Sequence, residues 1–276
     1  MTPETKIVRD HYQAAIADSQ ALLQRITTAV DAMEPPVNSR RLARLDQFHM
    51  GGLAATAAFA ERVGIAAGMQ VLDAGSGLGG PARYLAETYG AHVDGVDLAP
   101  DYVAIADLLT KRAGLTHLVS FREGDLAALP FDDAWFDLVW TQHVAMNIAD
   151  RAGLYREFRR ILKPGGRLAF YDPMAAEEWP SLIYPVPWAQ TAKTSTLLTI
   201  DETRTVIEQA GFAVTRLDDV TQEAMGWAQQ QGSPAEPGAI NAAMIVGARM
   251  AEMAANFVRN LQEKRVRLVM GIAAAI

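Results

Sequence analysis

The chain has 276 residues, of which 50% are hydrophobic and 21% charged, a composition typical of a soluble globular protein. Its formal net charge of -7 argues against the basic surface that nucleic-acid binding requires, so we expect no nucleic-acid partner. Cysteine is absent and the five histidines lack the spacing of a metal centre, so we expect no metal site. The polar start and the lack of a long apolar run predict a cytoplasmic protein with no membrane partner.

The first two thirds of the chain alternate between two kinds of pattern. Residues 8–32 have apolar side chains at helical spacing and predict one or two helices, which the prolines in 34–41 end. Compact β-rich runs then alternate with helical patterns, which is typical of a parallel sheet covered by helices on both faces. The β-rich runs are 69–74, 91–98, 117–124, 135–142 and 166–172, and the helical patterns are 81–90, 100–114 and 150–162.

After the fifth β-rich run the alternation loosens. Residues 173–199 are rich in proline and aromatic side chains and are too long for a simple connection, so they predict a cover over the substrate. Thr199 and Glu202 have the spacing of a capping box that opens a helix. A strand over 212–220, a helical pattern over about 238–264 and a last strand over 267–276 complete the prediction.

A glycine-rich turn follows the first β-rich run. Gly75, Gly77 and Gly80 satisfy the pattern G-x-G-x-x-G, and glycines there allow a sharp turn and a close approach of a ligand to the main chain. Asp73 ends the strand before the turn. Asp97 ends the next strand, about twenty residues on, where an acidic side chain can accept hydrogen bonds from ribose hydroxyls. At this point a nicotinamide dinucleotide and an adenosyl sulfonium both fit.

Three later features separate these ligands. Asp125 ends the third strand in the segment EGDLAALPF, FDLVWTQ forms the fourth strand, and a Lys-Pro-Gly-Gly turn precedes the fifth. Taken in this order, the set over about residues 68–220 resembles the class I S-adenosylmethionine-dependent methyltransferases. The segment DQFHMGG, the pair Asp172-Pro173 and the C-terminal segment resemble the sarcosine/dimethylglycine type of small-molecule methyltransferase. The chain departs from that type at His143, where an acidic residue is usual, and at Asn147, where a histidine is common.

The resemblance implies a fold, a cofactor and a set of binding residues. The fold is a Rossmann-like, mostly parallel seven-stranded sheet with an antiparallel last strand, and the cofactor is S-adenosylmethionine. Asp73 and the first two glycines would meet the methionine moiety, Asp97 the ribose, and Asp125 the adenine. The cofactor-binding residues expected in full are Asp73, Gly75, Ser76, Gly77, Asp97, Leu98, Gly124, Asp125, Leu126 and Gln142.

The domain plan and the candidate catalytic residues follow from the same reasoning. We expect an N-terminal helical cap over 1–67 and a methyltransferase core over 68–276 that contains the substrate-covering insertion at about 173–199. His49 and His143 lie beside the predicted cofactor mouth, and Tyr12 lies on the helical segment that could fold over it. These three are the catalytic candidates.

The predicted reaction is in-line transfer of the methyl group to a small-molecule acceptor. A neutral amine needs little help from a base, which favours N-methylation over O- or C-methylation. An NAD(P)-dependent oxidoreductase and a non-catalytic S-adenosylmethionine-binding protein remain the alternatives. Methionines at helical spacing near the C-terminus are compatible with a homodimer.

Overall fold

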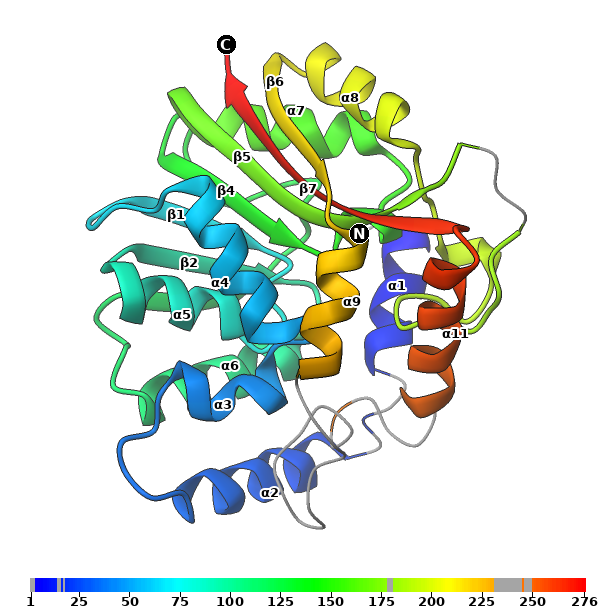
Figure 1. Ribbon diagram of the computed structural model, residues 1–276. Helices are drawn as coiled ribbons and strands as arrows, with labels where there is room; N and C mark the ends of the chain where they lie inside the picture. Colours follow the sequence, from blue (N-terminus) through cyan, green and yellow to red (C-terminus); the bar gives the residue numbers. More distant parts are fainter. Residues whose placement is uncertain (1–2, 14–15, 17, 178–180, 231–244, 246–249) are drawn as a thin grey trace.

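The sheet of the protein has seven strands in the order β3-β2-β1-β4-β5-β7-β6. The computed structural model describes residues 3–13, 16, 18–177, 181–230, 245 and 250–276 (Figure 1). Strands β1 to β5 are parallel to one another, and β7 is antiparallel to both β5 and β6. This arrangement confirms the predicted fold class. The strands are β1 Gln70–Ala74, β2 His92–Asp97, β3 Val119–Glu123, β4 Phe136–Gln142, β5 Leu162–Ala175, β6 Phe212–Asp219 and β7 Val266–Ala275.

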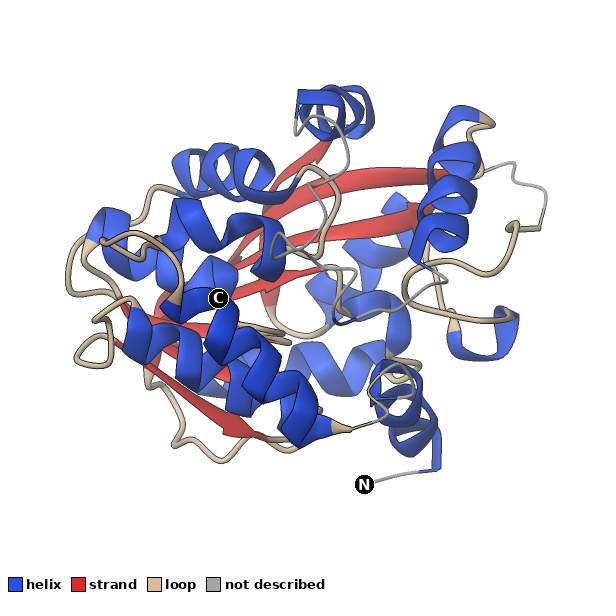
Figure 2. Cartoon of the chain, turned by 90° about the horizontal axis from the view of Figure 1, so that it is seen from below, coloured by secondary structure: helices blue, strands red, loops and turns tan. Residues whose placement is uncertain are grey.

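Helices lie on both sides of this sheet, as Figure 2 shows. Successive side chains of a strand point to opposite faces, so neighbouring residues of β1 enter different cores. Val71 packs in the core with α4 (Gly52–Val63) and α5 (Gly80–Tyr89), whereas Leu72 packs with α7 (Arg151–Ile161) and α8 (Ile200–Gln209). Both faces of the central strand are therefore buried, which explains its continuous apolar run.

The N-terminal segment forms helices α1 (Pro3–Gln13), α2 (Ser19–Asp31) and α3 (Ser39–Asp46) before α4. The expectation of one or two helices over 8–32 is confirmed. Side chains of α2 share a third core with α6 (Pro100–Arg112), which ties the N-terminal segment to the flank of the sheet. That core contains Leu22, Ile26 and Val30 from α2 and Tyr102, Ile105 and Leu109 from α6.

Strand order reverses between β1 and β4, because β2 and β3 lie on one side of β1 while β4 and β5 lie on the other. The carboxyl ends of parallel strands on either side of such a reversal form a crevice where open α/β sheets bind ligands. Figure 1 shows α1, α9 (Thr221–Gln230) and α11 (Met250–Gln262) grouped beyond this edge of the sheet. Helices from both ends of the chain therefore lie beyond the carboxyl edge of the sheet.

The fifth strand is longer than the predicted run 166–172. Phe136 pairs with Leu162 and Leu138 with Arg167, so two steps along β4 correspond to five along β5. Residues 163–166, the Lys-Pro-Gly-Gly segment, therefore bulge out of the ladder, and Gly165 has a φ of +73° that suits glycine. At its other end β5 extends to Ala175, three residues into the predicted insertion, because β7 pairs with it there.

The rest of the C-terminal half follows the prediction where it is described. Thr199 and Glu202 form the expected capping box at the start of α8. The predicted last strand is β7, and the strand predicted over 212–220 is β6. Of the helical pattern at 238–264, helix α11 covers 250–262, while 238–244 and 246–249 lie outside the described residues. Within the described part of the chain, no helix is long and apolar enough to cross a membrane.

Candidate active site

The glycine turn after β1 is held against the next strand. The main-chain N–H groups of Gly75 and Ser76 both donate to the carbonyl of Val96, at 2.8 and 3.0 Å. The N–H of Gly77 donates to Asp97 Oδ2 at 2.7 Å. Gly75 and Gly77 have φ angles of +76° and +52°, which side chains disfavour. The turn and the acidic end of β2 are therefore one hydrogen-bonded unit.

The third glycine of the pattern has a different role. A Cβ on Gly80 would lie 2.4 Å from the carbonyl oxygen of Asp46, at the end of α3. The carboxylate of Asp46 accepts a hydrogen bond from Arg83 Nη2 at 2.9 Å, and both side chains are fully buried. Gly80 thus allows α3 to pack on α5. Its match to the dinucleotide pattern has a structural cause and does not require a ligand.

Buried polar atoms without a partner lie at the start of the turn. Asp73 is 2% exposed, and its Oδ2 has no hydrogen-bond partner among the described residues. The same holds for the hydroxyl of buried Ser76. Burial, together with the nearby charge of Asp97, raises the pKa of Asp73 to about 7. Such atoms in a native fold call for an explanation, and a polar ligand is one.

The carboxylates after β2 and β3 are ordered by main-chain groups. Asp97 Oδ1 accepts from the N–H of Ala99 at 2.9 Å, and burial raises the pKa of this carboxyl group. Asp125 Oδ1 accepts from the N–H of Ala127 at 3.0 Å. The two segments are linked because the N–H of Gly124 donates to the carbonyl of Asp97 at 3.0 Å. Leu98 is half-buried and Leu126 is buried beside these carboxylates.

The end of β4 carries an oriented amide. Trp140 Nε1–H donates to Gln142 Oε1 at 3.0 Å. An indole nitrogen can only donate, so the amide oxygen of Gln142 must face it and the amide nitrogen must face away. That nitrogen, Nε2, is buried and has no partner among the described groups. Gln142 therefore presents a donor at the carboxyl edge of the sheet.

His49 and His143, predicted to flank the same mouth, lie with their ring centroids 6.0 Å apart. His143 has a φ of +54°, and its main-chain N–H donates to the main-chain carbonyl of Tyr171 at 2.7 Å. Burial lowers the pKa of His49 to about 4 and lowers the pKa of His143 well below its ordinary value, with the nearby His49 adding to the second shift. Both imidazoles are thus neutral at physiological pH.

The third catalytic candidate, Tyr12, reaches the site from α1. Its hydroxyl donates to Asn147 Oδ1 at 2.8 Å, and burial raises the pKa of the phenol above its ordinary value. The amide nitrogen of Asn147 donates to the carbonyls of Trp188 at 2.9 Å and Thr194 at 3.0 Å. One side chain therefore joins the N-terminal helix to the segment after β5. In the sequence, Asn147 stands out only as a departure from a family pattern.

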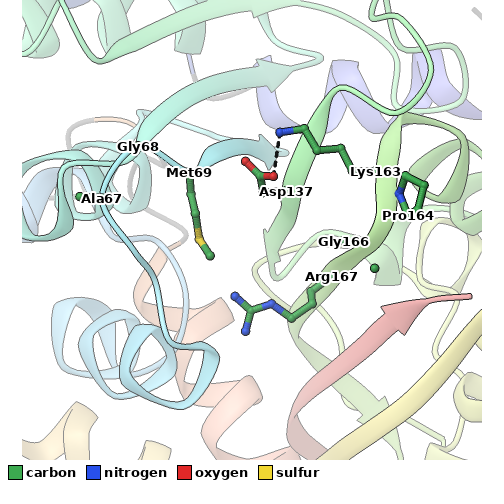
Figure 3. A pocket seen from close by; sticks show the side chains of 9 residues that line it. Ala67, Gly68, Met69, Asp137, Lys163, Pro164, Gly166 and Arg167 are labelled. Carbon is green, nitrogen blue, oxygen red and sulfur yellow. Dashed lines mark hydrogen bonds and ion pairs between the residues drawn. The ribbon is translucent and has the colours of Figure 1, made fainter.

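A separate depression of about 420 Å³ lies at the opposite edge of the sheet (Figure 3). It is lined by residues that precede β1 and by the bulge of β5. Its charged groups are already paired: Lys163 Nζ lies 2.7 Å from Asp137 Oδ1, and Arg167 donates to the carbonyls of Val63 and Gly64. The unpartnered polar atoms described above are at the carboxyl edge instead, so that edge is the candidate active site.

Known proteins resemble the part of the chain that contains this edge. Residues 72–170 match the family model described as "Methyltransferase domain". The chain is 40% identical over 118 residues to the glycine/sarcosine/dimethylglycine N-methyltransferase of Actinopolyspora halophila, covering 43% of this chain and 21% of the relative. It is 34% identical over 154 residues to the sarcosine/dimethylglycine N-methyltransferase of Halorhodospira halochloris, covering 55% and 54%. The chain thus spans about half or less of the length of these relatives.

The fold is shared more widely than the sequence. The crystal structure of geranyl diphosphate C-methyltransferase from Streptomyces coelicolor A3(2) aligns with a TM-score of 0.70 at 16% identity, covering 100% of this chain and 98% of that one. The matched segment begins in β1, contains the glycine turn and the ends of β2, β3 and β4, and stops within β5. Over residues 72–170 the chain therefore contains a domain of the class I S-adenosylmethionine-dependent methyltransferase family.

Proposed function

We propose that the protein transfers the methyl group of S-adenosylmethionine to an amine nitrogen of a small-molecule acceptor. The observation that carries the proposal is that Asp73 Oδ2, Ser76 Oγ and Gln142 Nε2, at the carboxyl edge of the sheet, are buried and have no hydrogen-bond partner among the described residues. The carboxylate and the hydroxyl can accept hydrogen bonds from an ammonium group, and the amide can donate to a carboxylate. The amino-acid end of the cofactor has both groups.

The remaining cofactor contacts are assigned to the ends of β2 and β3. The carboxylate of Asp97 accepts main-chain hydrogen bonds from Gly77 and Ala99 and keeps further lone pairs for ribose hydroxyls. Asp125 would accept from the adenine amine, with Leu98, Gly124 and Leu126 beside the ring. These assignments rest on the family resemblance. They are supported because these residues lie at the ends of β2 and β3, at the same carboxyl edge of the sheet, and because the N–H of Gly124 donates to the carbonyl of Asp97.

The chemistry proposed for the chain is mainly positioning. When bound, S-adenosylmethionine supplies a methyl group that the sulfonium charge already activates. Holding an acceptor in line with that methyl group can contribute roughly 7–11 kcal/mol, whereas a positioned base contributes about 10²–10⁴-fold. The side chains of His49, His143 and Tyr12 are proposed to hold the acceptor and exclude water at the mouth of the site.

The electrostatics of the two histidines support an amine acceptor. With a pKa of about 4 at His49 and a strongly lowered pKa at His143, neither imidazole is a strong enough base to deprotonate an alcohol. Either ring can accept a hydrogen bond from the N–H of a neutral amine. The lone pair of the amine nitrogen then stays free to attack the methyl group. Relatives named above include both N- and C-methyltransferases, so the acceptor atom rests on this argument.

Residues 1–67 are proposed as a cap, and residues 173–199, an insertion within a core over 68–276, as a cover over the acceptor. The bonds from Asn147 to Tyr12, Trp188 and Thr194 support this division, because they close the two segments over the end of β4. A homodimer through α11 stays a prediction. Met253 of that helix is 3% exposed and accepts from Gln190 of the same chain, so at least this part of the helix is covered within the subunit.

Ligand binding can be tested by thermal unfolding with S-adenosylmethionine, S-adenosylhomocysteine or NAD(P). A ligand at 100 times its dissociation constant stabilises by about 2.7 kcal/mol. We expect a rise in the unfolding temperature with the two adenosyl ligands. A rise with NAD(P) alone would overturn the proposal in favour of an oxidoreductase.

Turnover is tested separately with small amines, phenols, alcohols and carbon acids, with release of S-adenosylhomocysteine as the readout. We expect primary and secondary amines, which carry an N–H, to be the best acceptors. Faster turnover of alcohols or carbon acids would overturn the amine assignment. Binding of the adenosyl ligands with no turnover across the panel would favour a non-catalytic binding protein.

A further inference from the structure

Thr56 of α4 contacts both sides of the mouth of the candidate active site. It is fully buried, and its hydroxyl donates to Gln47 Oε1 at 2.8 Å. The same hydroxyl lies 3.0 Å from His49 Nε2 and 3.4 Å from Gln142 Oε1. None of the reasoning from sequence pointed to this residue. Its contacts join α4, the segment before it and the end of β4.

The hydrogen bonds of His49 fix the position of its proton. Nε2 lies 3.0 Å from the carbonyl oxygen of Gly52, and a carbonyl oxygen can only accept. Nε2 must therefore carry the hydrogen. The hydroxyl of Thr56 can accept from the same N–H while it donates its own hydrogen to Gln47. In a neutral imidazole the other nitrogen, Nδ1, is then an acceptor with a free lone pair.

The orientation of Gln142 is fixed by Trp140, and its amide oxygen lies next to Thr56. The amide oxygen of Gln142 receives the indole N–H of Trp140 at 3.0 Å and faces the hydroxyl of Thr56. A flipped amide would place a donor against the indole donor, so the observed orientation is the one that the surroundings allow. Near Thr56, His49 is thus fixed as an acceptor through its Nδ1, and Gln142 is fixed as a donor through its Nε2.

We propose that Thr56 is a positioning residue that holds the imidazole of His49 with its hydrogen on Nε2, so that Nδ1 accepts a hydrogen bond from the N–H of the methyl acceptor. This proposal rests on the proposed function and adds that His49 Nδ1 contacts the N–H of the acceptor. The bond to Nδ1 orients the nitrogen lone pair while the new nitrogen–carbon bond forms and the carbon–sulfur bond breaks. The methylated amine leaves as an ammonium ion and releases its proton to water.

The tautomer can be measured without any turnover, in protein labelled with ¹⁵N at its histidines. Long-range ¹H–¹⁵N spectra distinguish a protonated ring nitrogen from an unprotonated one, and comparison with His49→Gln assigns the signals. In the full-length protein we expect Nε2 of His49 to be protonated and Nδ1 unprotonated. A spectrum with Nδ1 protonated, or with the two tautomers in exchange, would overturn the proposal even if the protein is an active methyltransferase.

Variants at Thr56 test the positioning role. Thr56→Val keeps the shape of the side chain and removes the hydroxyl, and the loss of one net hydrogen bond corresponds to about a fivefold lower kcat. The KM for S-adenosylmethionine should change little, the His49 signals should broaden or shift, and Thr56→Ser should restore both. Thr203→Val, at a buried threonine of α8 outside the site, is the matched control and should behave like the wild type.

The outcomes separate the two proposals. If Thr56→Val has the wild-type kcat and unchanged His49 signals, or if Thr56→Ser behaves like the valine variant, the positioning role is wrong. If no acceptor is methylated but the Nε2–H tautomer is present and depends on Thr56, the proposed reaction fails while the structural inference about the ring holds.

Discussion

The side chain of Val144 occupies the space that a Cβ on Gly75 would need. An added Cβ would lie 2.4 Å from Val144 Cγ2, and Gly75 has a φ of +76°. The residue that follows the end of β4 thus packs directly on the glycine turn after β1. Because His143 is the neighbour of Val144, the position of the cofactor turn and the position of a catalytic candidate depend on the same contact.

Gly75→Ala should therefore reduce both stability and binding of S-adenosylhomocysteine. Left-handed backbone strain costs roughly 1–2 kcal/mol, and overpacking adds typically 1–3 kcal/mol. Gly64→Ala is the matched control, since Gly64 has a similar φ of +71° and an added Cβ there meets nothing within 4 Å. Denaturant unfolding and calorimetric titration measure the two effects. Equal losses in both variants would mean that the contact with Val144 is unimportant.

Asp73 should make the ligand-free protein less stable as the pH rises. Its pKa is about 7 in the folded chain and about 3.9 in an unfolded one, so between these values the native state keeps a proton that the unfolded state has released. The free energy of unfolding contributed by this group therefore falls between about pH 4 and pH 7. Asp73→Asn should remove that contribution, which unfolding curves at pH 4.5 and 7.5 would reveal as a smaller loss of stability than in the wild type.

The same carboxyl group should link ligand binding to proton release. An ammonium group beside Asp73 favours the ionised carboxylate and lowers its pKa. Binding of S-adenosylhomocysteine at pH 6 should therefore release up to about one proton, measured by calorimetry in buffers of different ionisation enthalpy. Asp73→Asn should bind weakly and release none. Proton uptake by the wild type would show that Asp73 does not face the ammonium group.

Local patterns made the fold and the glycine turn predictable. Apolar periodicity identified the strands, and the capping box from Thr199 to Glu202 marked the start of α8, because such features lie within a few residues of one another. The bulge at 163–166 was not predicted, since its shape depends on how β4 pairs with β5. A glycine-rich sequence indicated a turn there, and only the pairing shows that the strand continues on both sides of it.

The supporting contacts of the site could not be predicted, because they join residues far apart in the sequence. Thr56 lies 86 positions from Gln142, and Asp46 lies 37 positions from Arg83. No spacing rule relates such pairs. The sequence placed His49 and His143 near one mouth through a family resemblance, but the hydrogen bond that sets the tautomer of His49 and the burial that lowers both pKa values appear only in the folded chain.

The two histidines should affect turnover without controlling its pH dependence near neutrality. Because burial lowers the pKa of His49 to about 4 and holds the pKa of His143 far below its ordinary value, both stay neutral from pH 6 to 9. Activity in this range should follow the ionisation of the acceptor amine. His49→Ala and His143→Ala should each lower kcat by roughly 10-fold or more, within the range of a positioned group. Unchanged turnover in both variants would remove them from the catalytic set.

Asn147 should control how tightly the acceptor is held. Asn147→Ala removes three hydrogen bonds, to Tyr12, Trp188 and Thr194, whereas Tyr12→Phe removes only the one from its hydroxyl. At about 1 kcal/mol for each net bond, the KM for the acceptor should rise about fivefold in Tyr12→Phe and considerably more in Asn147→Ala. Tyr89→Phe, at the end of α5, is the control and should leave the KM unchanged. Steady-state kinetics with varied acceptor at saturating S-adenosylmethionine separate KM from kcat. If Asn147→Ala changes kcat and leaves the KM for the acceptor unchanged, the bonds of Asn147 act on the methyl-transfer step. Closure of the proposed cap and cover would then not determine acceptor binding.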